Sequence, residues 1–71
     1  MKSYVDDILR RSELLARVMN GEELSKADAA YIFKVSEVTI NRDIKALRDS
    51  GISIFSKKNR LILEGVPSQQ S

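Results

Sequence analysis

The chain is 71 residues long, enough for one small domain, and its hydrophobic fraction of 42% suffices for one modest core. It has no cysteine, which excludes disulfides and thiolate metal sites, and no apolar run near the roughly 18 residues of a membrane span, so we expect a cytoplasmic protein without membrane contact. The net charge of +2 is unevenly spread, because residues 34–71 carry a net +3 and residues 1–33 a net −1, and a basic half favours a polyanionic partner.

The first predicted element is a long amphipathic helix from Tyr4 to Met19, which Asn20-Gly21 would end. Its apolar side chains recur at helical spacing at positions 4, 5, 8, 9, 15, 18 and 19. We expect Leu15, either Val18 or Met19, and Leu24 in the following link to enter the core.

A short second helix, residues 26–33, is expected to start after the capping residue Ser25. Ala29 and Ala30 give it an inner face that lets a neighbouring helix approach closely, and Phe33 completes that face. Only the dipeptide "KV" separates this helix from the next one. The turn is so short that the axes of the two helices must cross sharply.

The third predicted helix is capped by Ser36, runs to about Ser50 and stops at Gly51. At about 100° per residue its apolar residues fall in one narrow sector, at Ile40, Ile44 and Leu47. The opposite sector contains Val38, Arg42, Lys45 and Asp49, with Thr39 and Asn41 on its flanks. A protruding helix face with these polar residues suits a groove such as the major groove of DNA.

Two short strands are expected after the third helix, "ISIF" at residues 52–55 and "RLILE" at residues 60–64, joined by "SKKN". Helix, helix, short turn, helix and hairpin is the order of elements in a winged helix-turn-helix. We therefore predict a mainly α fold with a small β-hairpin, a three-helix winged helix-turn-helix domain over residues 1–65. Residues 66–71, from a polar stretch that includes Pro67, are expected to form a disordered tail or the start of a linker.

The segment "FKVSEVTINRDIKALRDSG" resembles the helix-turn-helix of DeoR-type bacterial regulators, in which a V-S-x-x-T-I-x-R-D-[IL]-x-x-L pattern marks the turn and the recognition helix. The matching positions are Val35, Ser36, Thr39, Ile40, Arg42, Asp43, Ile44 and Leu47. WYL-type regulators share this pattern, and the resemblance covers roughly residues 12–64. Two features depart from it: Lys34 occupies a turn position where Gly or Asn is common, and "SKKNR" replaces a glycine-rich hairpin tip.

The resemblance implies a transcriptional regulator that binds double-stranded DNA, with the third helix in the major groove and a basic hairpin, the wing, on the backbone. Arg42 is expected to favour guanine and Asn41 adenine, while Val38 suits a thymine methyl group. The predicted DNA-binding residues are Ser36, Glu37, Val38, Thr39, Asn41, Arg42, Lys45, Lys57, Lys58 and Arg60.

Two of these assignments have alternatives, and one charged residue of the third helix, Asp43, is left out of them. Thr39 either bonds a phosphate or is simply a half-buried helix residue. The basic wing tip either contacts phosphates or is a solvated turn. Asp43 would be anionic beside DNA, so we expect it to have a structural role and to pair with an arginine.

The main alternative function is a winged helix that contacts only other proteins, because a fold does not fix a function. The Arg, Lys and Asn on the third helix argue against it, since protein interfaces are enriched in aromatic and apolar residues. An enzyme is not expected, because the sequence lacks His, Cys, a glycine-rich phosphate loop and a paired-carboxylate motif, and no cofactor is predicted. The chain is either a fragment of a larger regulator or a complete small one, such as those of phages or plasmids.

Tyr4, Val5, Ile8 and Leu9 lie before the region that the resemblance covers, yet they are apolar at helical spacing. A domain of this size has little core left to cover them, so part of this stripe should be exposed. Two readings stay open: the helix packs on the back of its own wing, or two copies bury the stripe as a weak homodimer. A two-fold axis through such a dimer would present paired recognition helices to a palindromic site.

Overall fold

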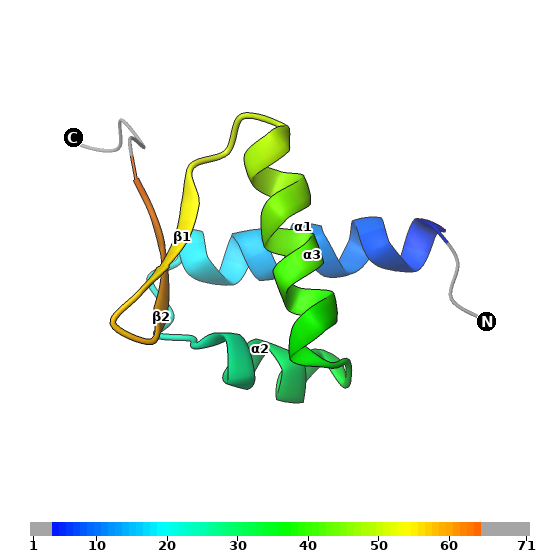
Figure 1. The fold of residues 1–71 in the computed structure, drawn as a ribbon, viewed down its shortest axis with the longest axis horizontal. Helices are drawn as coiled ribbons and strands as arrows, with labels where there is room; N and C mark the ends of the chain where they lie inside the picture. Colours follow the sequence, from blue (N-terminus) through cyan, green and yellow to red (C-terminus); the bar gives the residue numbers. More distant parts are fainter. Residues whose placement is uncertain (1–3, 65–71) are drawn as a thin grey trace.

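A computed structural model describes residues 4–64 of the chain as three helices followed by a two-stranded antiparallel sheet (Figure 1). The predicted fold class is confirmed: the arrangement is mainly helical and is that of a winged helix-turn-helix. The tail expected at residues 66–71 lies outside the described residues. The elements are α1 (Tyr4–Met19), α2 (Lys26–Phe33), α3 (Glu37–Asp49), β1 (Ile54–Lys57) and β2 (Arg60–Leu63).

Local sequence signals set the ends of the helices. Ser25 forms a capping box with Asp28, in which each side chain accepts a hydrogen bond from the other residue's backbone N–H. Gly21 and Gly51 follow α1 and α3 with φ of 87° and 98°, a left-handed conformation that favours glycine after a helix. These caps confirm the helix boundaries that the sequence predicts.

The core lies where the three helices and the hairpin meet, and Leu14 rather than Leu15 is the fully buried residue at the centre of α1. Leu15 is half-buried, and Met19, an alternative core candidate, is 63% exposed. The reason is helix rotation, since Leu14 and Val18 lie one turn apart on the inward face. The buried apolar residues are Leu14, Val18, Leu24, Ala29, Ala30, Ile40, Ile44, Leu47, Ile54 and Leu61.

The hairpin is tighter than the sequence analysis predicted. β1 begins two residues later than expected and continues to Lys57, which pairs with Arg60. Lys58 and Asn59 alone form the turn, with φ of 52° and 61°. Positive φ at both central residues is the pattern of a type I′ turn, whose twist matches that of the flanking strands. The backbone N–H of Leu61 donates to the Leu24 carbonyl oxygen at 2.6 Å, which fixes the hairpin beside the α1–α2 link.

The two ends of α1 have different surroundings (Figure 1). Its C-terminal half lies beside the hairpin, whereas its N-terminal end projects past α3 on the side away from the strands. Val5, Ile8 and Leu9 are accordingly exposed, as expected for part of the stripe, and they do not pack on the wing. The reading in which α1 covers the back of its own wing with these residues is therefore wrong. The side chain of Tyr4 lies outside the described part of the structure.

Candidate nucleic-acid interface

The helix-turn-helix unit consists of α2, a three-residue turn and α3, which cross in Figure 1. Ala29 and Ala30 are buried at this crossing, and their small side chains let the helices approach. Lys34 caps α2 in a left-handed conformation with φ 58° and ψ 44°, and its N–H donates back to α2. The turn position where related sequences often have Gly or Asn is therefore one that disfavours a side chain.

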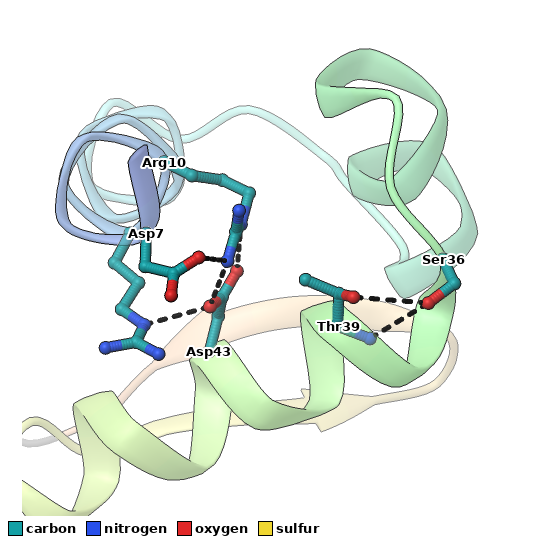
Figure 2. Close-up of polar contacts among 6 residues, drawn as sticks. Asp7, Arg10, Ser36, Thr39 and Asp43 are labelled. Atoms are coloured by element: carbon teal, nitrogen blue, oxygen red, sulfur yellow. Dashed lines mark hydrogen bonds and ion pairs between the residues drawn. The ribbon is translucent and has the colours of Figure 1, made fainter. Parts of the chain in front are cut away.

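Ser36 begins α3 as its N-cap, as predicted (Figure 2). Its hydroxyl oxygen accepts a hydrogen bond from the Thr39 backbone N–H at 3.2 Å and lies 3.2 Å from the Thr39 hydroxyl. Ser36 is exposed and Thr39 is half-buried. Thr39 thus belongs to the helix cap, and its hydroxyl lies at the end of α3 where backbone N–H groups suit an anion.

The outer face of α3 is exposed, and its inner face is buried. Ile40, Ile44 and Leu47 point into the core, so the residues half a turn away face solvent. Val38 is 61% exposed and adds one apolar side chain to this otherwise polar surface. The structure places five predicted DNA-binding residues on this exposed surface, namely Glu37, Val38, Asn41, Arg42 and Lys45.

Asp43 differs from the other charged residues of α3 because it is fully buried. Arg10 Nη2 donates to Asp43 Oδ1 at 2.9 Å, and Arg11 Nε donates to the same oxygen at 2.9 Å. Arg10 Nη2 also donates to Asp7 Oδ1 at 2.9 Å, so Arg10 lies between two carboxylates, Asp7 of α1 and Asp43 of α3 (Figure 2). The expected structural pairing of Asp43 with an arginine is confirmed, and this carboxylate points away from any DNA on the outer face.

Two opposing effects act on the Asp43 carboxyl group. Burial by itself would raise the pKa of Asp43, because a low dielectric disfavours the charged form. Hydrogen bonds from Arg10 and Arg11 outweigh burial and lower the pKa of Asp43 below its ordinary value. The hydrogen bond to Asp43 also raises the pKa of the Arg10 guanidinium. Both groups therefore stay charged at neutral pH.

The wing carries its basic residues at an exposed turn. Lys57 and Lys58 are exposed and no ion pair involving either is seen within the described residues. Arg60 is also exposed, but its Nη1 lies 3.1 Å from Glu23 Oε2 on the α1–α2 link. Of the three predicted wing residues, Arg60 is therefore partly neutralised, whereas the two lysines extend the positive charge away from the domain.

Two basic residues near α3 were missed by the sequence analysis. Lys26 at the start of α2 and Arg48 near the end of α3 line one hollow beside α3. Its other lining residues are Asn41, Ile44, Lys45 and the acidic Asp49, whose carboxylate lies 3.4 Å from Lys45 Nζ. The Arg48 guanidinium carbon also lies 4.8 Å from the centre of the Phe55 ring, a cation–π contact between α3 and β1. The spacing within α3 places Arg48 one turn beyond Lys45 and two turns beyond Asn41, but nothing in the sequence places Lys26 beside them.

The described residues favour some ligand classes over others. None of the three helices in residues 4–64 has the length and apolar character of a membrane span. Nor does this part of the chain contain three or more His, Cys, Asp or Glu side chains grouped to hold a metal ion. The outer surface of α3, the hollow beside it and the wing tip carry more cationic and amide side chains than carboxylates, and cationic and amide groups bind phosphates and base edges.

A family model described as "HTH domain" matches residues 10–66 of the chain, which includes α2, the turn, α3 and the wing. The chain belongs to this helix-turn-helix domain family. Membership indicates DNA binding by a regulator, and domains of this family are typically non-enzymatic. No curated protein and no solved structure matches the chain.

The matched region of this helix-turn-helix domain starts at Arg10, the first of the two arginines that hold Asp43. It therefore includes the ion pair as well as the turn and both helices of the motif. The N-terminal turns of α1, with Val5, Ile8 and Leu9, lie before it. The exposed stripe on these turns is thus separate from the part of the chain that defines the family.

Proposed function

We propose that this helix-turn-helix domain binds double-stranded DNA with sequence preference, as a transcriptional regulator or as the DNA-binding part of one. The observation that carries the proposal is the outer face of α3, where Asn41, Arg42 and Lys45 are exposed on a helix whose opposite face is buried. The short turn after α2 leaves that face protruding, and a protruding helix fits the major groove.

The residues on α3 have different roles in this proposal. Arg42 donates two hydrogen bonds to a guanine, Asn41 bonds an adenine, and Val38 contacts a thymine methyl group. Glu37 faces a base edge or a flanking phosphate from the first turn, where an acid accepts a hydrogen bond from cytosine. Lys45 contacts the backbone of the groove, because a flexible ammonium group acts as a point charge.

Backbone contacts surround this readout on several sides. Ser36 and Thr39 bind a phosphate at the N-terminus of α3, where free N–H groups and the helix dipole favour an anion. Lys57 and Lys58 bind phosphates from the wing, with Arg60 mainly holding the wing against Glu23. Lys26 and Arg48 extend the cationic surface around the hollow beside α3. Such contacts position a protein on DNA and add affinity without selecting a sequence.

The motif around α3 supports a narrower assignment. The motif matches the pattern of DeoR- and WYL-type regulators at polar positions as well as apolar ones. The matching polar positions include Thr39, Arg42 and Asp43. We therefore place the protein among bacterial or phage regulators of this kind, acting in the cytoplasm. A winged helix that contacts only proteins is the alternative that the following experiment tests.

The experiment is a gel shift on random duplex and on duplex selected from a random pool by the protein, each titrated with salt. We expect tighter binding to the selected DNA and an affinity that falls as salt rises, because binding releases counterions. Lys45→Glu should abolish the shift on both DNAs. Arg17→Glu, at a half-buried position of α1 away from the outer face of α3, serves as the control for charge reversal once its folding is verified, because it places a third carboxylate beside Glu13 and Glu22. No shift at low salt, with a folded protein, would refute DNA binding and favour the protein-interaction module.

A further inference from the structure

The outer face of the hairpin carries an aromatic ring that the core does not use. Side chains alternate along a strand, so Phe55 points away from the core, which the buried Ile54 enters. Phe55 is nevertheless half-buried, although it is not among the partly buried residues that pack against the core. The guanidinium group of Arg48 lies over the ring, with its carbon 4.8 Å from the ring centre. A cation from α3 therefore covers part of the Phe55 ring.

Arg48 has no acceptor for its N–H groups. It is exposed, and no side-chain hydrogen bond or ion pair of Arg48 is found within residues 4–64. The contact with Phe55 holds the charge of the guanidinium group in place, while its N–H donors stay available to a further partner. A planar fork of donors with fixed position matches the geometry of a phosphate group.

The hollow beside α3 surrounds Arg48 with further positive charge. Lys26 and Lys45 line it together with Arg48, against a single lining carboxylate, that of Asp49. Asp49 lies 3.4 Å from Lys45 Nζ, whereas no ion pair of Lys26 is found in the described part of the chain. The excess of cations favours an anion in the hollow.

The hollow lies between the two surfaces that we propose to contact DNA. Asn41 and Lys45 line the hollow and also belong to the exposed surface of α3. On the other side, α3 packs beside β1 (Figure 1), where Lys57 lies on the same strand face as Phe55. A DNA backbone that runs from α3 to the wing tip therefore crosses the position of Arg48.

We propose that Arg48 binds one backbone phosphate of the DNA and that Phe55 positions the guanidinium group for this contact. The inference rests on the proposed function, which it extends by one phosphate contact and by one residue without a polar side chain. Phe55 touches no DNA group in this arrangement and acts only through Arg48. A side chain that is already held in place loses less conformational entropy when it binds.

The position of Arg48 in α3 suggests a simpler role. Arg48 is in the last turn of the helix, where a cation complements the helix dipole. That role would make Arg48 contribute to stability only, and it would not require the Phe55 ring. DNA affinity therefore distinguishes the dipole role from the phosphate contact.

Salt-titrated binding to random duplex tests the contact and its positioning. Arg48→Ala should weaken binding about fivefold and lower the salt slope by about one, because one phosphate contact is lost. Phe55→Leu should weaken binding about threefold with the slope of the wild type, because the cation remains but is no longer held. Phe55→Tyr keeps the ring and should bind as the wild type does. An unchanged affinity and slope in Arg48→Ala would overturn the phosphate contact.

The double variant separates positioning from a general effect on the wing. Once Arg48 is alanine, Phe55→Leu should cause no further loss of affinity. Equal losses from Phe55→Leu with and without Arg48 would overturn the positioning role. Ile62→Ala is the matched control, because Ile62 is paired directly with Phe55 in the hairpin and has no recorded contact with a cation. It should leave the affinity unchanged, and a loss as large as that of Phe55→Leu would also overturn the positioning role.

NMR of the arginine side chains tests the site without DNA. In a titration with inorganic phosphate at constant ionic strength, the Arg48 Nε–H signal should shift with concentration. The Arg17 signal on α1 serves as the reference, and Phe55→Leu should reduce the Arg48 response. The absence of any Arg48 response would overturn the site. A response in a protein that binds no duplex would refute the proposed function but support the anion site.

Discussion

Arg10 and Asp43 form a buried two-point ion pair that links α1 to α3, with both Nε and Nη2 of the guanidinium donating to the carboxylate. The Asp43 side chain is fully buried and that of Arg10 is 8% exposed. Charge-assisted hydrogen bonds of this geometry are strong and directional. The helix that we propose to enter the major groove is therefore oriented by an ion pair as well as by apolar packing.

Asp43→Asn should destabilise the domain by about 3 kcal/mol, because it removes the buried carboxylate that Arg10 and Arg11 share and leaves Arg10 with only the half-buried Asp7 as a counter-charge. The value is at the low end for broken buried pairs, since Arg11 is partly exposed. Urea denaturation measures the change. Asp49→Asn breaks the exposed pair with Lys45 and should cost at most about 0.5 kcal/mol. Equal losses of unfolding free energy in the two variants would show that the buried pair stabilises the domain no more than the exposed pair does.

The same pair makes stability depend on acid pH. Because the pKa of Asp43 is lowered on folding, its contribution is fully present above the pKa of an unfolded aspartate, about 3.9. That contribution is lost as the pH falls from there through the lower pKa of the folded state. Urea unfolding between pH 7 and pH 2 should show this loss in the wild type. In Asp43→Asn this component should be missing, and an identical acid profile would contradict the assignment.

Lys34→Gly should stabilise the domain by about 1 kcal/mol. A side chain at φ 58° is strained by its Cβ, and glycine removes that strain at the α2–α3 turn. Lys34→Ala is the matched control, because it removes the same charge and keeps the Cβ, and it should bring no such gain. Thermal or urea unfolding compares the three proteins, and equal stability of the two variants would exclude backbone strain as the cause.

Arg42→Ala should cost about 1–3 kcal/mol of binding free energy on selected DNA and less on random duplex, if Arg42 reads a base. Quantitative gel shifts on both DNAs measure the difference. Arg17→Ala removes an arginine from α1, on a surface away from the outer face of α3, and should change neither affinity. Equal losses on both DNAs would make Arg42 a phosphate contact.

Lys58→Gly should separate stability from binding. Glycine relieves the positive φ of 52° at the first turn position, so the hairpin should become more stable by up to about 1 kcal/mol. The loss of one cation should weaken binding to selected and random DNA alike and reduce the salt slope by about one. Lys57→Ala, in the adjoining strand position, should weaken binding without the gain in stability. An unchanged salt slope in both variants would place the wing away from DNA.

Short-range chemistry made much of this fold predictable. Ser25 and Ser36 cap helices because their hydroxyls accept local backbone bonds, and Gly51 ends α3 because its backbone tolerates positive φ. The inward face of α3 also followed from spacing alone. These features depend on residues within a turn or two, so the sequence contains what is needed to predict them.

Features that depend on distant residues were harder to predict. Leu14 and Leu15 are equally apolar, and the rotation of α1 that buries Leu14 accompanies the contact between Arg10 and Asp43, which are 33 residues apart. The predicted start and end of the first strand were wrong because Lys58 adopts positive φ, which is uncommon for a lysine, so the sequence did not mark the two-residue turn. Lys26 was missed because its place beside α3 depends on how the helices cross. The DNA contacts of the candidate residues stay predictions.

The wing is anchored to the rest of the domain through its backbone, close to the turn. Leu61 bonds the carbonyl of Leu24 through main-chain atoms, and only Lys58 and Asn59 lie beyond the paired strands. Residues inserted between those two would lengthen the hairpin into solvent without disturbing the buried Ile54 and Leu61. Loop tips of this kind tolerate insertion. If the domain binds DNA as we propose, the reach of the wing can therefore change at its tip while the core and the outer face of α3 stay the same.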